Sequence, residues 1–364
     1  SATTIIFAPG DSTTSTLYGI YADTKENLII KNLKITNAYF GIYFNNVDTS
    51  VVENVWAVGT ITNQRSGIYI ANGSCSNTVR NCYLENNVYG VRFFSSSQYN
   101  SILNNYADSC SAGFQFDTSS YNIITNNTAN SMLNYGFYFD SSSYNILTNN
   151  TANSNWRGYF IENYSNYNNF TNNTANSNSQ SGFRIYKYSK YNTLSGNTAN
   201  SNGYYGLESD NYSDYNTFTN NSAFSNSFAG ISINISDSCN CSGNILNNNN
   251  KGISISGKNN IITNNVMNSN DSYGIYIAAT GSNFISQNEI LNNKYYQIYV
   301  NGSGTLFWSN NIKTSSTNPD SLAYNNVNAI INMANNYWST SDSGVINSRL
   351  AGPYKTKIQY IPFR

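Results

Sequence analysis

The chain has 364 residues, and 18 Lys and Arg balance 18 Asp and Glu, so its formal net charge is zero. Without an excess of positive charge there is no electrostatic basis for binding nucleic acid, and we expect no nucleic-acid partner. The 32 Tyr and 18 Phe exclude a disordered chain, because so many aromatic side chains must bury surface. No apolar run approaches the roughly 18 residues of a membrane span, so we expect a protein that does not span a membrane.

The residue types that usually bind metals are scarce. Histidine is absent, and the five cysteines, at 75, 82, 110, 239 and 241, lack the spacing of a zinc site. Carboxylates beside Asn carbonyls could hold Ca²⁺, but no ligand loop is recognisable, so calcium is not predicted. We therefore expect no metal centre and no cofactor, and we expect the cysteines to be small buried hydrophobes.

A glycine followed by alternating apolar residues recurs along the chain at intervals of 22 to 26 residues. Strict alternation over four or five residues predicts a half-buried strand. A second short strand is expected after each Tyr-Asn or its equivalent, as in "YNIITNN" (121–127), and a third near "NTANS" (127–131). The glycines that begin the first strand are Gly19, Gly41, Gly67, Gly90, Gly113, Gly136, Gly158, Gly182, Gly206, Gly230, Gly252 and Gly274, and Tyr296 takes this position in a last copy.

Three short strands and three turns in each repeat form one coil of a parallel β-helix, a solenoid fold. We predict an all-β, single-stranded parallel β-helix of about 13 coils with one domain over residues 1–364. The first coil occupies 1–18, the regular coils 19–310 and a closing segment 311–364. Coils about 4.8 Å apart place identical residues in columns. Two such columns are expected to be an Asn ladder (Asn100, Asn122, Asn145, Asn168, Asn192, Asn216) and a Tyr stack (Tyr99, Tyr121, Tyr144, Tyr167, Tyr191, Tyr215).

The "TNNTANSN" units (148–155 and 171–178) resemble the right-handed parallel β-helix superfamily with NosD-like repeats, and in particular cell-surface proteins of methanogenic archaea. The segment "NNYWSTSDSGVINSRLAGPYKTKIQYIPF" (335–363) resembles the C-terminal closure of such proteins. The resemblance implies a right-handed helix and an extracellular or cell-surface location, where some of the twelve Asn-x-Ser/Thr sequons could carry glycan. The superfamily contains pectate-lyase-like enzymes, epimerases, adhesins and surface-layer proteins. Its methanogen members include disaggregatase-type enzymes that cut a chondroitin-like matrix.

The residues two and four positions after each glycine are expected to point outward, and they are charged or aromatic in the middle coils. Asp117, Asp140 and Glu162 occupy consecutive coils and are the candidate catalytic residues. Asp117 and Asp140 would lie near the ~5–5.5 Å of a retaining glycosidase pair, and Asp117 and Glu162 near ~9.5 Å, the upper end for an inverting pair. Three neighbouring carboxylates cannot all ionise freely, so one pKa is expected to rise and supply a general acid.

Arginines on the same face could hold a uronate or sulfate group, and aromatic side chains could stack on sugar rings. The candidate substrate-binding residues are Arg92, Gln115, Tyr138, Trp156, Arg157, Phe160, Arg184, Tyr186, Lys187, Glu208 and Asp210.

Two classes of function remain open. The first is an extracellular enzyme that degrades an acidic, uronate-containing, chondroitin-like polysaccharide. Hydrolysis is slightly favoured over elimination, because the carboxylates outnumber the candidate lyase bases. The second is a structural surface-layer, sheath or filament subunit or an adhesin, whose open β-helix ends could self-associate. An outward cluster of charge is also what a merely solvated surface would carry.

Overall fold

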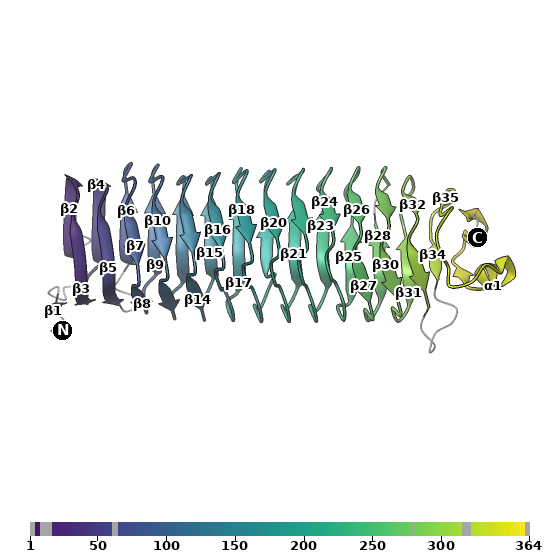
Figure 1. The fold of residues 1–364 in the computed structure, drawn as a ribbon, viewed down its shortest axis with the longest axis horizontal. Helices are drawn as coiled ribbons and strands as arrows, with labels where there is room; N and C mark the ends of the chain where they lie inside the picture. Colours follow the sequence, from purple (N-terminus) through teal and green to yellow (C-terminus); the bar gives the residue numbers. More distant parts are fainter. Residues whose placement is uncertain (1–3, 8–16, 60–64, 279, 315–321, 361–364) are drawn as a thin grey trace. The chain divides into compact units, whose positions relative to one another are not determined.

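A computed structural model describes residues 4–7, 17–59, 65–278, 280–314 and 322–360. The regular secondary structure of the described residues consists of short β-strands joined by turns, apart from one short helix, α1 (Ser343–Ser348), and one 3-10 turn, η1 (Lys355–Lys357) (Figure 1). The chain divides into two compact units, unit 1 (Ser1–Ser179) and unit 2 (Gln180–Arg364), which are described separately below. The expectation of one domain stays a prediction. Most of the expected first coil, at 1–3 and 8–16, and the last residues of the closing segment, 361–364, lie outside the described residues.

In unit 1, the glycine-led strands pair in parallel, each with the strand one coil further along the chain, as Figure 1 shows. We call this the main sheet of the unit. Its strands are β2 (Tyr18–Glu26), β4 (Phe40–Asp48), β6 (Ser66–Ala71), β9 (Tyr89–Phe94), β12 (Ala112–Asp117), β15 (Tyr135–Asp140) and β17 (Arg157–Glu162). The other strands are β1 (Thr4–Phe7), β3 (Ile29–Thr36), β5 (Val51–Val58), β7 (Thr78–Arg80), β8 (Tyr83–Glu85), β10 (Ser101–Leu103), β11 (Tyr106–Asp108), β13 (Ile123–Thr125), β14 (Thr128–Asn130), β16 (Ile146–Thr148) and β18 (Asn169–Thr171).

Unit 2 repeats this parallel arrangement. Its main sheet contains β19 (Phe183–Ile185), β21 (Tyr205–Asp210), β23 (Ala229–Asn234), β25 (Lys251–Ile255), β28 (Tyr273–Ile277), β31 (Tyr296–Val300), β34 (Ala323–Asn325) and β36 (Leu350–Ala351). The other strands are β20 (Thr193–Ser195), β22 (Thr217–Thr219), β24 (Asn240–Ser242), β26 (Ile261–Thr263), β27 (Val266–Asn268), β29 (Phe284–Ser286), β30 (Glu289–Leu291), β32 (Leu306–Trp308), β33 (Asn311–Lys313), β35 (Ile331–Asn332) and β37 (Ile358–Gln359).

These strands confirm the predicted parallel β-solenoid. Each glycine-led segment, from the one at Gly19 to the last copy at Tyr296, forms a main-sheet strand. The closing segment adds two more short strands to the main sheet of unit 2, β34 and β36, so the regular pairing continues further than the repeat pattern indicated. The pattern missed them because neither strand keeps the glycine and the alternating apolar residues of the earlier copies.

The alternation in each main-sheet strand separates an apolar core from an outward face. Phe114, Phe116, Phe137 and Phe139 are fully buried, and the rings of Phe116 and Phe139 stack with their centroids 4.7 Å apart. The leading glycine is required by a close approach of backbone. A Cβ atom on Gly113 would lie 2.7 Å from the Cβ atom of Ala129 and 2.8 Å from the carbonyl oxygen of the next glycine. A larger residue there would therefore force neighbouring coils apart.

The predicted Asn ladder is present within each unit. In unit 1 the Asn122 side chain donates to Oδ1 of Asn145 over 3.1 Å, and the same oxygen accepts from the Asn122 backbone N–H over 2.9 Å. A second buried ladder, which we did not predict, passes through Asn105, Asn127 and Asn150. These amides satisfy buried backbone groups at the turns, which accounts for much of the Asn content without invoking a function.

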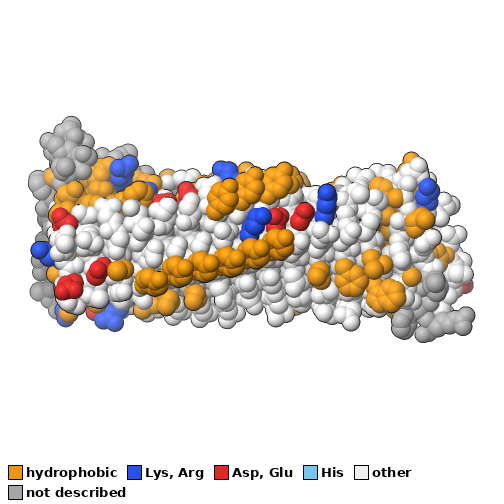
Figure 2. All heavy atoms as spheres, turned by 90° about the horizontal axis from the view of Figure 1, so that it is seen from above, with side chains coloured by type: hydrophobic (Ala, Val, Ile, Leu, Met, Phe, Trp, Pro, Cys, Tyr) orange, Lys and Arg blue, Asp and Glu red, His pale blue; other side chains and the backbone are white. Residues whose placement is uncertain are grey.

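The predicted Tyr stack is also present within each unit. The ring centroids of Tyr121 and Tyr144 are 4.9 Å apart in unit 1, and those of Tyr191 and Tyr215 are 4.9 Å apart in unit 2. Figure 2 shows hydrophobic side chains in lines on the molecular surface. Tyr121 and Tyr144 have positive φ values, 60° and 59°, so the stack follows a left-handed turn position. This supports a structural role for the column.

The cysteines are expected to be nearly inert. All five are free thiols, and burial raises the pKa of Cys82, Cys110 and Cys239 to about 12 and that of Cys241 well above its ordinary value. A hydrogen bond to Asp48 raises the pKa of Cys75, the one thiol that is not buried. Because the thiolate is the reactive form, titration with a disulfide reagent at pH 8 should modify at most one thiol slowly in the native protein and all five after denaturation. Rapid modification of two or more native thiols would contradict this packing.

Candidate functional site

In unit 1, the outward face of the main sheet brings together the candidate catalytic carboxylates. The strand register places Asp117 beside Asp140 and Asp140 beside Glu162. The register therefore gives the expected order of the three carboxylates on consecutive strands, whereas the predicted distances between them stay predictions. The same register places Arg92, Gln115, Tyr138 and Phe160 in a second outward column.

The carboxylate of Asp117 is neutralised from within the protein. Arg92 donates from Nε to Oδ2 of Asp117 over 2.7 Å, and the Gln115 amide donates to both carboxylate oxygens over 2.9 and 3.0 Å. Arg92 also packs against the rings of Tyr89 and Phe94. Its guanidinium is thus oriented by a protein carboxylate and aromatic rings before any substrate arrives.

The other two carboxylates have separate hydrogen-bond donors. The Tyr138 hydroxyl donates to Oε1 of Glu162 over 2.6 Å, whereas Oδ1 of Asp140 accepts from the Ser141 hydroxyl and the Asn163 amide. Burial, and then the hydrogen bond to Glu162, raise the pKa of Tyr138. Different donors for each carboxylate offset the repulsion expected of like charges on neighbouring strands.

The aromatic candidates of unit 1 pack mainly on one another. Phe160 is 5 % exposed, and Arg157 lies with its guanidinium carbon 3.9 Å from the Trp156 ring centroid and 4.8 Å from that of Phe160. Trp156 retains 36 % of its surface exposed. Of these candidates, Trp156 therefore offers the most open ring to a sugar.

In unit 2, the structure brings Arg184, Glu208 and Asp210 into one cluster. Arg184 lies beside Glu208 in register. Its guanidinium is 2.7 Å from Oδ2 of Asp210 and 3.4 Å from Oε2 of Glu208. The Ser181 hydroxyl donates to Glu208 over 2.9 Å, and the Asn234 amide donates to Asp210 over 2.8 Å. Burial opposes the charged form of Arg184, but the two carboxylates together raise its pKa.

This cluster lines a pocket of about 390 Å³. Glu208 is 4 % and Asp210 8 % exposed, so two nearly buried carboxylates with one shared arginine face the same hollow. Burial, and then the charge of Glu208, raise the pKa of Tyr205 in the pocket wall. The lining residues are Gln180, Ser181, Arg184, Tyr204, Tyr205, Glu208, Asp210 and Asn234.

Tyr186 and Lys187 lie beside the cluster. The Arg184 guanidinium carbon is 4.4 Å from the Tyr186 ring centroid, and the Lys187 ammonium is 5.5 Å from the same centroid. Neither residue lines the pocket. Tyr186 therefore contacts the arginine of the cluster without lining the pocket.

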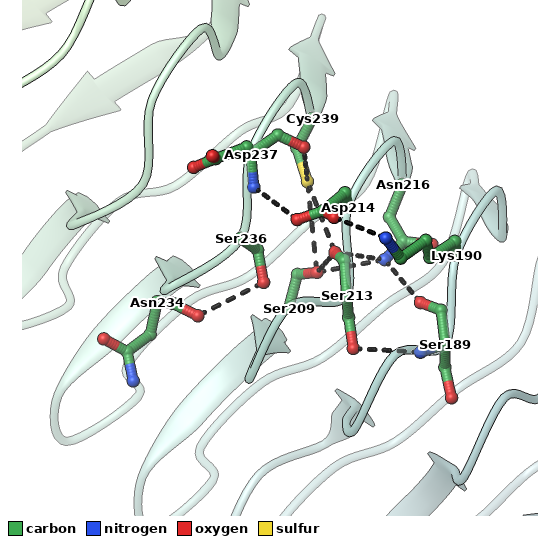
Figure 3. A network of polar contacts seen from close by, with 10 residues as sticks. All are labelled: Ser189, Lys190, Ser209, Ser213, Asp214, Asn216, Asn234, Ser236, Asp237 and Cys239. Atoms are coloured by element: carbon green, nitrogen blue, oxygen red, sulfur yellow. Dashed lines mark hydrogen bonds and ion pairs between the residues drawn. The ribbon is translucent and has the colours of Figure 1, made fainter.

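A polar network anchors the strand that carries the two carboxylates (Figure 3). Between Glu208 and Asp210, the inward Ser209 donates to the carbonyl oxygen of Ser213 over 2.6 Å and accepts from the Asn216 amide over 3.0 Å. The Cys239 thiol lies 3.9 Å from the Ser209 hydroxyl oxygen. These contacts tie the end of β21 to the following turn.

Our sequence reasoning missed six residues of this region. Gln180, Ser181, Tyr204, Tyr205 and Asn234 line the pocket, and Ser209 supports it from behind. Ser209 had a usable signal, because the corresponding inward residues of neighbouring main-sheet strands, Ile185 and Ile233, are apolar. Tyr205 and Lys251 lie one residue before a leading glycine, a position that belongs to neither of the two predicted outward columns.

Comparison with known proteins agrees with this architecture. The family model described as right-handed β-helix region matches residues 18–175, 131–223 and 158–290. The chain belongs to the right-handed β-helix family. This confirms the predicted superfamily and its handedness, whereas the NosD-like and methanogen cell-surface features stay predictions. A search of curated protein sequences found no match.

Solved structures of this fold include enzymes that act on polysaccharides. The A-module of the Azotobacter vinelandii mannuronan C-5 epimerase AlgE6 is 14 % identical, with a TM-score of 0.61 over 89 % of this chain and 91 % of that one. A variant of the periplasmic alginate epimerase AlgG is 14 % identical, with a TM-score of 0.58 over 81 % and 77 %. A PL6 alginate lyase bound to a trisaccharide is 13 % identical, with a TM-score of 0.52 over 99 % and 88 %. At this identity the likeness shows the fold alone.

Metal-binding clusters and membrane-spanning helices are both absent from the part of the chain that the structure describes. No group of three Cys, Asp or Glu side chains there is arranged to hold a metal ion. No helix in these residues has the length and apolar character needed to cross a membrane.

Proposed function

We propose that this β-helix is a polysaccharide-processing enzyme, and that it is a glycoside hydrolase acting at the carboxylate pocket of unit 2. The observation that carries the proposal is the pair of nearly buried carboxylates, Glu208 and Asp210, facing one pocket of about 390 Å³. Keeping two carboxylates nearly buried costs desolvation energy, which a structural surface has no reason to bear but which tunes the acidity of catalytic groups.

A pair of carboxyl groups is the usual apparatus of glycoside hydrolysis. One carboxylic acid protonates the glycosidic oxygen as the bond to the anomeric carbon breaks, and the other group, as a carboxylate, activates water or attacks that carbon. Glu208 and Asp210 are two residues apart on one strand face, which corresponds to about 6.6 Å along the strand. Arg184 and the phenol rings of Tyr204 and Tyr205 would position the sugar.

The protonation of two tyrosines in the candidate centres, Tyr138 and Tyr205, favours hydrolysis over elimination. A lyase must remove a proton beside a uronate carboxylate, and without histidine its base would be a phenol, an amine or a carboxylate. The pKa values of Tyr138 and Tyr205 are both raised, first by burial. Both phenols therefore remain protonated at neutral pH and are poor bases.

The carboxylates of unit 1, Asp117, Asp140 and Glu162, form the second candidate centre. We infer an acidic, uronate-containing substrate and an extracellular or cell-surface location. The family resemblance supports both, and so does the similarity of fold to the two alginate epimerases and the alginate lyase. The alternative, a non-catalytic surface subunit, needs no pocket lined with carboxylates.

The test is cleavage of a panel of acidic polysaccharides, with chondroitin, alginate and polygalacturonate included. Reducing ends and absorbance near 235 nm are both measured, for wild type, Asp210→Asn and Asp140→Asn. Reducing ends without absorbance, lost in Asp210→Asn, are expected. Loss only in Asp140→Asn would move the centre to unit 1, and absorbance would indicate a lyase. No product from any polymer with a folded protein would favour the surface subunit.

A further inference from the structure

The arginine of the unit 2 pocket already has two protein partners. The Arg184 guanidinium contacts both Glu208 and Asp210. Because the proposed hydrolysis keeps one of these carboxyl groups protonated, the other balances the positive charge of Arg184, and the pocket presents no net positive charge to the carboxylate of an acidic sugar. An acidic substrate therefore requires a positive group beyond the pocket.

Lys251, at the start of β25, is a cation on the same face of the same sheet. Through the register, Tyr205 of the pocket lies beside Ala229, and Ala229 lies beside Lys251. Two strand spacings, about 9.6 Å, thus separate β21 from β25. A short oligosaccharide bound in the pocket covers such a span.

Aromatic rings connect the pocket to Lys251. The Tyr204 ring centroid lies 4.5 Å from that of Phe228. The Lys251 ammonium lies 5.6 Å from the Phe228 centroid and 4.6 Å from that of Tyr276. Flat apolar rings on both sides of an ammonium group form the kind of surface on which a sugar ring stacks while its acid group reaches the charge.

Among the described residues, no carboxylate is paired with Lys251. Its neighbours across the strands are Ala229 and Tyr273, and none of the ion pairs found among the described residues includes it. Burial among these groups lowers the pKa of Lys251. An anion bound to the ammonium group would stabilise its charged form and offset the desolvation, so the site favours an anionic ligand.

We propose that Lys251, Phe228 and Tyr276 form a subsite for the acidic sugar of a polysaccharide whose neighbouring unit occupies the Glu208–Asp210 pocket. The proposal that the neighbouring sugar reacts in the pocket rests on the proposed function. The carboxylate or sulfate of the sugar pairs with the Lys251 ammonium, and the sugar ring lies against the aromatic side chains.

Binding measured without turnover tests the subsite. Oligosaccharides of chondroitin, alginate and polygalacturonate, each with a carboxyl-reduced counterpart, are titrated calorimetrically against Asp210→Asn, alone or with Lys251→Met. Lys258→Met replaces an exposed lysine of the same unit and is the matched control. We expect Lys251→Met to weaken binding of an acidic oligosaccharide about tenfold to a hundredfold, with little effect on its reduced counterpart.

The subsite is wrong if Lys251→Met binds the acidic probe as tightly as its parent, if Lys258→Met weakens binding equally, or if neutral probes bind best. Acidic binding that depends on Lys251, without cleavage by the otherwise wild-type protein, would remove the proposed hydrolase and leave the subsite intact. If Lys251→Met leaves the cleavage of an acidic polymer unchanged, the subsite is removed and the proposed hydrolase is left intact. Loss of cleavage with unchanged binding would assign Lys251 to the chemistry instead.

Discussion

The Asp210→Asn variant is expected to lose at least about a hundredfold in the rate of polysaccharide cleavage, because positioned acid–base groups contribute about 10²–10⁴-fold. The amide keeps the size of the carboxylate and still offers an oxygen to Arg184, whose guanidinium lies 2.7 Å from Oδ2 of Asp210. It cannot take up or supply a proton in the reaction. Initial rates of reducing-end release at saturating substrate measure the effect on kcat.

Asp214→Asn is the matched control. Asp214 lies four residues further along the same coil, where its Oδ2 accepts from the Lys190 ammonium over 2.7 Å and Oδ1 accepts from the Asp237 backbone N–H (Figure 3). It does not line the pocket. An equal loss of rate in both variants would show that a general change of charge, rather than the pocket, is responsible. A full rate in Asp210→Asn would contradict our assignment.

The second large effect is expected in the unpredicted Asn ladder of unit 1. Oδ1 of Asn150 accepts from both the backbone and the side chain of Asn127, and its amide donates to the carbonyl oxygen of Ile124 and to Asn173. Asn150→Ala leaves these buried groups without partners, at about 1–3 kcal/mol for each, so we expect a loss of roughly 3 kcal/mol or more. The denaturation midpoint, followed by circular dichroism, should fall clearly.

Thr148→Ala is the comparison, because Thr148 lies in the same coil and is only partly buried. Its midpoint should stay close to that of wild type. Since each coil contacts mainly its neighbours, the Asn150 variant is also expected to broaden the transition as unit 1 unfolds in part. A midpoint that is unchanged in Asn150→Ala would mean that the ladder contributes little to stability.

The chemistry of the outward face was only partly predictable. The columns of Asp117, Asp140 and Glu162 and of Arg184 and Glu208 followed from counting residues, because the side-chain period of a strand is two. Whether a carboxylate faces a pocket depends on residues from several coils, as with Ser181, Tyr204 and Asn234. The repeat alone therefore did not distinguish Asp210, which lines a pocket, from Asp117, although each is paired with an arginine.

The sequence by itself determined the β-solenoid, the inward and outward faces, and the Asn and Tyr columns, because a repeat of fixed period stacks like residues once the backbones of successive coils pair. Only the tertiary structure decided which charged side chains form ion pairs within the protein. From the sequence, Arg92 and Arg184 are both expected to be available to an acidic substrate. In the structure Arg92 contacts Asp117, and Arg184 contacts Glu208 and Asp210. Lys251, in contrast, lies against the aromatic ring of Tyr276. A long side chain can reach several residues on the same face of the sheet. Local burial and geometry, rather than the repeat period, determine which of them it contacts.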